Sequence, residues 1–161
     1  MGWLIRMTVS IHNQIEIAVS AEDLFNYVTQ PWKWHEWHPN SRSAKAAHSF
    51  LATGDEFVEV IEVQPLAPLP PRMIRTTSYT VVESVPFHTW KVEGRMKDGW
   101  LRIRYDFEEQ DGLTLFTRAL SFDVSGINRI LRPLLKSKME KISVVALQNL
   151  KQIIEAKTDE S

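Results

Sequence analysis

Residues 125–157 read SGINRILRPLLKSKMEKISVVALQNLKQIIEAK, and this stretch decides the fold. Its apolar residues recur every three or four positions, as they do on one face of an α-helix. Ser125 can cap a helix N-terminus, whereas Pro133 lacks a backbone N–H and would break a continuous helix. We therefore predict a short turn at 126–131 and one helix at about 133–156, roughly 36 Å long. A helix of that length needs an apolar surface to lie across.

The composition indicates a globular chain without a membrane span. Of 161 residues, 43% are hydrophobic and 24% charged, and the formal net charge is −1, which argues against nucleic-acid binding. No stretch is apolar enough to cross a membrane or to serve as a secretory signal. We expect one cytoplasmic domain over 1–161, with frayed ends at 1–6 and 158–161. The last helix is rich in lysine, which we interpret as a solvated face; a transient membrane contact stays open.

Most of the remaining chain alternates apolar and polar residues with a period of two, the spacing of half-buried strands. This pattern predicts strands at 9–19, 57–63, 73–85, 87–96, 100–108 and 113–124, with a weaker edge strand within 40–50. Residues 20–38 predict two short helices, the first capped by Ser20 and ended by Pro31. The segments Lys97-Asp98-Gly99 and Gln110-Asp111-Gly112 predict tight hairpins, and hairpins imply an antiparallel sheet.

These elements predict an α+β fold in which a curved antiparallel sheet of six to seven strands wraps around the long C-terminal helix. Two short helices follow the first strand. The apolar face of the sheet needs one cover, and only the last helix is long enough to provide it. A cavity remains between sheet and helix if the helix does not fill the concave face.

Four segments carry a resemblance to a known superfamily. They are SAEDLFNYVTQPWKWHEWHP at 20–39, ESVPFHTWKVEG at 83–94, GLTLFTRALSFDV at 112–124 and GINRILRPLLKSKMEK at 126–141. Their order resembles the polyketide cyclase/dehydrase and lipid-transport proteins, also known as the START-like, Bet v 1-like or SRPBCC superfamily, which has the helix-grip fold. The resemblance implies a pocket for a hydrophobic small molecule between sheet and helix. It implies no single chemistry and no shared catalytic residues, because members include lipid carriers, hormone receptors and aromatase/cyclases.

Candidate ligand-binding residues lie on the inward-facing sets of these elements. They are Trp34, Trp37, Trp90, Val92, Ile103, Tyr105, Arg118, Leu120, Leu135, Met139 and Ile142. Trp34 and Trp37 resemble a packing pattern of the family, so either they pack under the sheet or one ring floors the pocket. A buried Arg118 needs solvent, a protein carboxylate or a ligand oxygen as its partner. Further polar candidates are Asn13, Thr76, Ser78, Thr80 and His88.

No residues point to a metal, a cofactor or a defined catalytic group. His35 and His38 are three positions apart, which is not the two-histidine spacing of a zinc protease, and no third ligand cluster lies nearby in the sequence. There is no nucleotide-binding fingerprint and no Ser-His-Asp order. The absence of cysteine excludes disulfides and thiolate ligands.

The loop at 64–72, QPLAPLPPR, contains four prolines and predicts a stiff connection between two strands. We predict that Leu66 and Leu69 lean toward the pocket mouth and toward 127–131, where they would form a gate. The alternative is that they are ordinary exposed leucines.

Two functions remain open. The first is a carrier or sensor that binds a lipid, polyketide or aromatic molecule. The second is a cyclase, aromatase or dehydratase that uses the same cavity without metal or nucleotide cofactor. Binding is favoured because no acid/base pair can be placed at a defined spacing. A third reading, an interaction protein with a vestigial pocket, ranks lowest. The identity of the ligand and the oligomeric state do not follow from the sequence.

Overall fold

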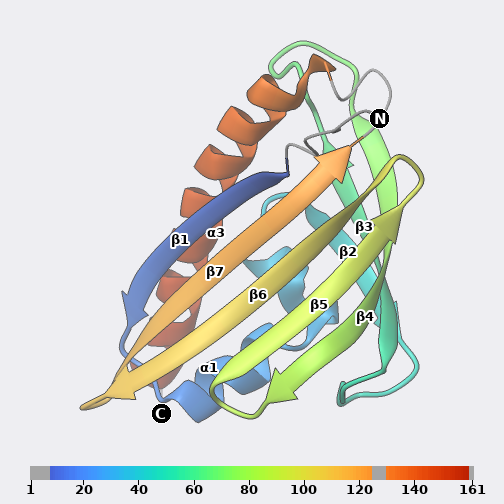
Figure 1. Cartoon of the computed structure of the whole chain (residues 1–161). Coiled ribbons are helices and arrows are strands. Elements are labelled where there is room, and N and C mark those ends of the chain that lie inside the picture. The colour runs from blue at the N-terminus through green and yellow to red at the C-terminus, as the bar shows by residue number, and fades with distance from the viewer. Residues whose placement is uncertain (1–7, 125–129, 160–161) are drawn as a thin grey trace.

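A seven-stranded antiparallel sheet and one long helix across its inner face make up the protein (Figure 1). The computed structural model describes residues 8–124 and 130–159. The strand order is β1-β7-β6-β5-β4-β3-β2, so β1 and β2 are the two edges of the sheet. The predicted α+β helix-grip fold, with its curved sheet and long C-terminal helix, is confirmed.

The elements follow the predicted order closely. The strands are β1 (Val9–Ile17), β2 (Ser41–Ala46), β3 (Glu56–Val63), β4 (Met73–Val85), β5 (Thr89–Met96), β6 (Gly99–Gln110) and β7 (Leu113–Val124). The helices are α1 (Ala21–Val28), the short 3-10 helix η1 (Pro31–Glu36) and α3 (Arg132–Asp159). The helix α3 includes Thr158 and Asp159, which the sequence analysis placed in a frayed end. The predicted frayed residues 1–6 and most of the predicted turn at 126–131 lie outside the described residues.

None of the helices within the described residues combines the length and the apolar character that a membrane span requires.

The phase of β4 is the main correction to the sequence reading of the strands. Thr77, Tyr79 and Val81 are buried, whereas the predicted inward residues Thr76 and Ser78 are exposed. The register between β4 and β5 shifts between Val81 and Glu83, as it does at a β-bulge. The bulge turns Glu83 away from the inner face, although a strict alternation would place it on the same face as Tyr79 and Val81.

The two predicted hairpins differ in their turns. In the β6–β7 hairpin Asp111 and Gly112 have φ angles of 54° and 81°, the left-handed conformation of a two-residue hairpin turn. In the β5–β6 hairpin, which the sequence predicted over 97–99, Met96 pairs with Gly99, so only residues 97 and 98 connect the strands and Gly99 belongs to β6. Gly99 allows the backbones of β6 and β7 to lie close together, because a Cβ at this position would lie 2.1 Å from the carbonyl oxygen of Asp123.

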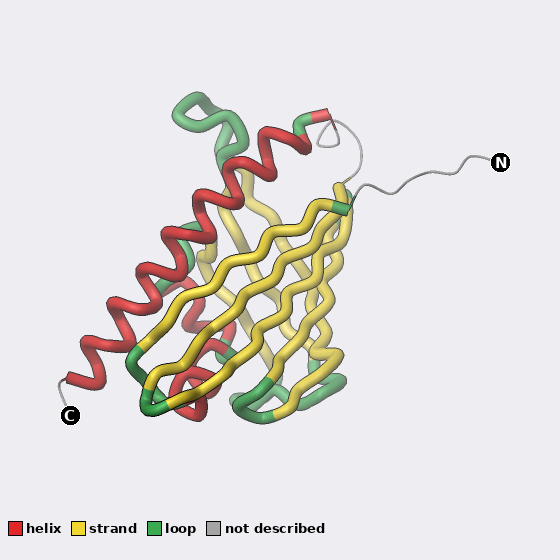
Figure 2. The backbone as a smooth tube through the Cα atoms, turned by 60° about the vertical axis from the view of Figure 1, so that its left-hand side comes forward, coloured by secondary structure: helices red, strands yellow, loops and turns green. Residues whose placement is uncertain are grey.

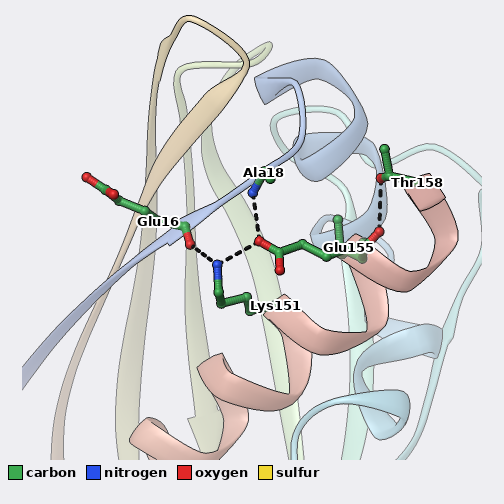
Figure 3. A network of polar contacts seen from close by, with 6 residues as sticks. Glu16, Ala18, Lys151, Glu155 and Thr158 are labelled. Carbon is green, nitrogen blue, oxygen red and sulfur yellow. Dashed lines mark hydrogen bonds and ion pairs between the residues drawn. The ribbon is translucent and has the colours of Figure 1, made fainter.

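The helix α3 is tied to the edge strand β1 by its C-terminal half (Figure 3). The Nζ of Lys151 donates to the carbonyl of Glu16 at 2.8 Å, and the Ala18 N–H donates to Oε1 of Glu155 at 3.0 Å. Lys151 and Glu155 also pair with each other at 2.6 Å. Side chains of the helix therefore satisfy backbone groups that an edge strand would otherwise leave unpaired.

Burial along α3 rises from its first half to its second. The buried residues of the helix are Ser143, Ala146, Leu147, Leu150 and Ile154, all at or beyond position 143. Leu135 and Met139 in the first half are only partly buried. In both overall views the loop at 64–72 stands beside the first turns of α3 (Figures 1 and 2). The first half of the helix is therefore where the inner face of the sheet is least tightly covered.

Candidate ligand-binding cavity

A cavity of about 160 Å³ lies between the first half of α3 and the inner face of the sheet. Its apolar walls come from Ile61, Val63, Met96, Leu101, Ile103, Leu120, Phe122, Val124, Leu135, Met139 and Ile142. Pockets for drug-sized ligands usually measure about 300–1,000 Å³. The cavity as it stands therefore suits a small molecule. A larger one requires the flexible side chains of Met96 and Met139 to move.

The cavity changes from apolar to polar along β6 and β7. Successive cross-strand pairs on the inner face are Leu101 with Phe122, Ile103 with Leu120, and Tyr105 with Arg118. The first two pairs are entirely apolar, and the third brings a phenol next to a guanidinium. Tyr105 is 1% exposed and Arg118 is 5% exposed, so the polar end is deep inside the protein.

Arg118 is a buried cation with a neutral partner. Its Nη1 donates to Oγ of Ser143 on α3 at 2.8 Å, and its Nε is buried without a hydrogen-bond partner. No ion pair joins it to a carboxylate in residues 8–124 and 130–159. Of the partners considered from the sequence, both solvent and a directly paired protein carboxylate are therefore wrong for this structure. The remaining alternative, an oxygen of a ligand, stays a prediction.

Glu59 on β3 is a buried carboxyl that the sequence analysis missed. It is 5% exposed; its Oε2 accepts a hydrogen bond from Ser41 Oγ at 2.8 Å, and its Oε1 accepts one from Tyr79 OH at 3.2 Å. Burial raises the pKa of Glu59, and the two hydroxyl donors and Arg118 offset part of that effect. The signal in the sequence was the alternation, since Glu59 shares its phase with the buried Phe57.

The histidine at the polar end is neutral. Nδ1 of His38 accepts the backbone N–H of Asn40 at 3.2 Å, which leaves the ring proton on Nε2. Burial, followed by the positive charge of Arg118, lowers the pKa of His38 to about 3. Across the described parts of the chain, no group of three or more histidine and acidic residues is arranged to hold a metal ion.

Two buried tyrosines complete the polar end. Burial raises the pKa of both Tyr79 and Tyr105, so each phenol keeps its proton at neutral pH. The ring of Tyr79 lies over Gly94 of the neighbouring strand, where a Cβ would be 2.7 Å from Cε1 of the ring. The glycine therefore makes room for the tyrosine that binds Glu59.

Most of the candidate residues named from the sequence line this cavity. They are Trp34, Trp37, Ile103, Tyr105, Arg118, Leu120, Leu135, Met139 and Ile142. Trp90 and Val92 do not line it; both are fully buried on β5, next to their cross-strand partners Tyr105 and Ile103 of β6. Trp90 stacks on Tyr105 with ring centroids 5.5 Å apart, so its role is to support the wall. Whether the lining residues bind a ligand remains a prediction.

The two tryptophans of the η1 region combine packing with a place in the wall. The Trp34 ring meets four aromatic rings of the sheet edge to face, with centroids at 5.6–6.4 Å. Its Nε1 donates to the carbonyl of Val28 at 2.7 Å. Both tryptophans also line the cavity, so the two alternatives considered from the sequence are compatible.

Other polar candidates from the sequence lie outside the cavity lining. His88 is exposed in the turn before β5, and Thr80 is partly buried on β4. Asn13 on β1 faces Arg118 across the β1–β7 pair, and its Oδ1 is buried without a hydrogen-bond partner. Asn13 is therefore a neighbour of the polar end rather than part of its surface.

The predicted gate residues lie beside the cavity. Leu66 and Leu69 are 41% and 66% exposed and do not line it, although Gln64 and Pro65 of the same loop do. The loop reaches α3 through Lys138, whose Nζ donates to the carbonyl of Ala67 at 3.2 Å. The predicted contact of the leucines with 127–129 lies outside the described residues.

A second depression, about 570 Å³, lies at Ser20, Ala21, Glu22, Phe87, His88, Phe107, Glu108 and Glu109. Most of these residues are exposed, so the depression is open to solvent. It has no counterpart to the buried polar groups of the cavity beneath α3, which remains the candidate site.

A curved sheet that holds a long helix over a partly apolar cavity defines the helix-grip class of ligand-binding folds. Residues 8–155 match the family model described as polyketide cyclase / dehydrase and lipid transport. The chain belongs to this family, as its sequence motifs predicted. No curated protein sequence matches the chain significantly.

Solved structures show the same fold at low sequence identity. The Zhui aromatase/cyclase from Streptomyces sp. R1128 has a TM-score of 0.72 and 12% identity, with 94% of this chain and 96% of that chain covered. Protein TTHA0849 from Thermus thermophilus has a TM-score of 0.70 and 9% identity, with coverage of 92% and 99%. A conserved protein from Geobacillus kaustophilus has a TM-score of 0.70 and 16% identity, with coverage of 93% and 97%. At these identities the likeness concerns the fold alone.

Proposed function

We propose that this protein binds a small, mostly apolar molecule in the cavity between α3 and the sheet, as a carrier or sensor. The observation that supports this most directly is the cavity itself, whose walls are aliphatic and aromatic and whose deep end carries a few convergent polar groups. Binding sites for small molecules have this composition, because apolar contact supplies affinity and a few polar groups fix orientation. Membership of a family named for lipid transport and polyketide cyclisation supports the same proposal.

A filled-cavity variant tests the proposal. Met139 lines the cavity from α3, and Met139→Trp would occupy part of its volume. Val144 lies on the same helix with its side chain 45% exposed, so Val144→Trp is a matched control. The binding of a fluorescent naphthalene probe is measured by titration, and co-purified molecules are sought by native mass spectrometry. We expect Met139→Trp to weaken probe binding by about tenfold or more and Val144→Trp to leave it unchanged. Equal binding by both variants, or no binding by the unmodified protein, would refute the proposal.

An enzyme of the cyclase or dehydratase type is the second candidate. It is favoured by the carboxyl of Glu59, whose pKa is raised by burial and which lines the same cavity as the neutral His38. Enzymes often hold acid/base groups in such environments. It ranks second because both oxygens of Glu59 already accept hydrogen bonds from Ser41 and Tyr79. Loss of turnover with retained binding in Glu59→Gln would support the enzyme; ligand recovered unaltered after prolonged incubation would support the carrier.

A further inference from the structure

Arg118 has no ion-pair partner among the described residues. The other cations of the cavity lining have protein partners, since Arg75 Nη1 meets Asp98 Oδ1 at 2.5 Å and Lys138 Nζ meets the Ala67 carbonyl at 3.2 Å. Arg118 is bonded to the neutral hydroxyl of Ser143, and its Nε has no partner. Burying a charge without a counter-charge costs several kcal/mol, so an arginine in this position calls for an anion.

The described part of the chain supplies no free anion at this end of the cavity. Glu59 is the acidic residue of the lining, and Arg118 influences it electrostatically, but the two do not form an ion pair. Both carboxyl oxygens of Glu59 are taken by hydroxyl donors. A water at Arg118 Nε would satisfy that donor and would still leave the guanidinium without an anionic partner.

The other groups around Arg118 carry hydrogens that can be donated. Tyr105, its cross-strand partner, is a protonated phenol, and His38 carries a proton on Nε2. A guanidinium together with such donors matches the lone pairs of a carboxylate, which accepts two parallel N–H bonds from an arginine. The walls beyond this end are apolar, from the Ile103/Leu120 pair to Met139.

We infer that the ligand is a small monocarboxylic acid whose carboxylate pairs with Arg118 and whose apolar part lies between Ile103, Leu120 and Met139. This inference rests on the proposed function and names the chemistry of the ligand. The cavity of about 160 Å³ favours a compact aromatic or short aliphatic acid over a long lipid chain.

Matched acid and amide probes test the inference. Cinnamic acid and cinnamamide have nearly the same shape, and only the acid carries a negative charge at pH 7. Their dissociation constants are measured by calorimetry, with naphthalene as a neutral apolar probe. The variants are Arg118→Met, which removes the charge, Arg118→Lys, which keeps the charge without the fork of donors, and Arg95→Met as an exposed control on β5. Circular dichroism shows whether each variant is folded.

We expect the unmodified protein to bind the acid about tenfold or more tightly than the amide. Arg118→Met should bind the two probes with equal affinity. Arg118→Lys should keep a weaker preference for the acid, and Arg95→Met should show the same preference as the unmodified protein. Equal binding of acid and amide by the unmodified protein overturns the inference, as does a preference that survives in folded Arg118→Met. If Arg118→Met does not fold, the inference is decided by comparing acid and amide binding in the unmodified protein and in Arg118→Lys. Binding of neutral probes alone refutes the carboxylate and leaves the proposed function standing. If no probe binds, both proposals fail.

Discussion

Replacing Arg118 by methionine should stabilise the protein in the absence of ligand, although the residue lies in the deepest part of the cavity. The guanidinium is 5% exposed and donates a hydrogen bond to the neutral hydroxyl of Ser143. Methionine has a similar length, is flexible and needs no polar partner. The substitution therefore removes a buried charge without leaving a large void.

The expected gain follows from two opposing terms. The desolvation of a buried ion costs several kcal/mol, and that cost disappears with the charge. The lost hydrogen bond between Arg118 and Ser143 involves a charged donor, and such bonds contribute about 1.5–3 kcal/mol. Glu59 loses a favourable charge nearby but keeps its bonds to Ser41 and Tyr79. We expect a net gain of about 2 kcal/mol, or a rise in Tm of roughly 4–8 °C for a chain of this size.

The assay is urea unfolding at pH 7, followed by tryptophan fluorescence and supported by calorimetry. Ser143→Ala is the companion variant, because it removes the neutral partner and keeps the charge, and it should destabilise by about 2 kcal/mol. Arg95→Met on the exposed face of β5 should change stability by no more than about 0.5 kcal/mol. A marked loss of stability in Arg118→Met would show that the guanidinium has a stabilising partner, and the account of an uncompensated charge would then be wrong.

Three further predictions concern the gate leucines, His38 and Gly94. Leu66→Ser with Leu69→Ser should change ligand association and dissociation rates in stopped-flow experiments while hardly moving Tm, because both side chains are exposed. Between pH 6.5 and about 3 the unfolded state binds more protons at His38 than the folded state does, so stability should fall as the pH falls through this range. That contribution amounts to at most about 1.4 kcal/mol per pH unit, and His38→Gln should remove it from acid unfolding curves. Gly94→Ala should destabilise by about 1–3 kcal/mol in urea, because its Cβ would lie 2.7 Å from the ring of Tyr79.

Each of these predictions has its own control. Leu113 is 45% exposed at the far β6–β7 hairpin, and Leu113→Ser should leave ligand rates unchanged; a lowered Tm with unchanged rates in the double variant would end the gate hypothesis. The raised pKa of Glu59 acts in the opposite direction to His38, since it adds stability at low pH that is lost as the pH rises through that pKa, so Glu59→Gln separates the two effects. An unchanged acid slope in His38→Gln would contradict an imidazole that is neutral in the folded protein. For the glycine, an alanine variant as stable as the parent would show that Tyr79 moves without cost.

The order and kind of the elements could be predicted from the sequence because they depend on local patterns. Alternation over 100–108 and 113–124 matches the buried and exposed faces of β6 and β7, and Pro133 lies next to the observed start of α3. Local patterns failed at β4, where Thr76 and Ser78 are exposed and a register shift between Val81 and Glu83 interrupts the alternation. They also failed at Gly99, which is required by the neighbouring strand β7 and not by a turn type or a positive φ.

By itself the sequence determined a curved antiparallel sheet, a long helix to cover it and a cationic residue on the inner face, because periodicity and side-chain type are properties of single segments. Only the tertiary structure decided that Glu59, Tyr79, Tyr105 and His38 share one cavity with Arg118, and that Ser143 is its partner. These residues come from β3, β4, β6, β7, α3 and the segment after η1, which lie far apart in the sequence. Their proximity is set by strand order and by where α3 crosses the sheet, and pKa shifts that arise from burial have no counterpart in the chain before it folds.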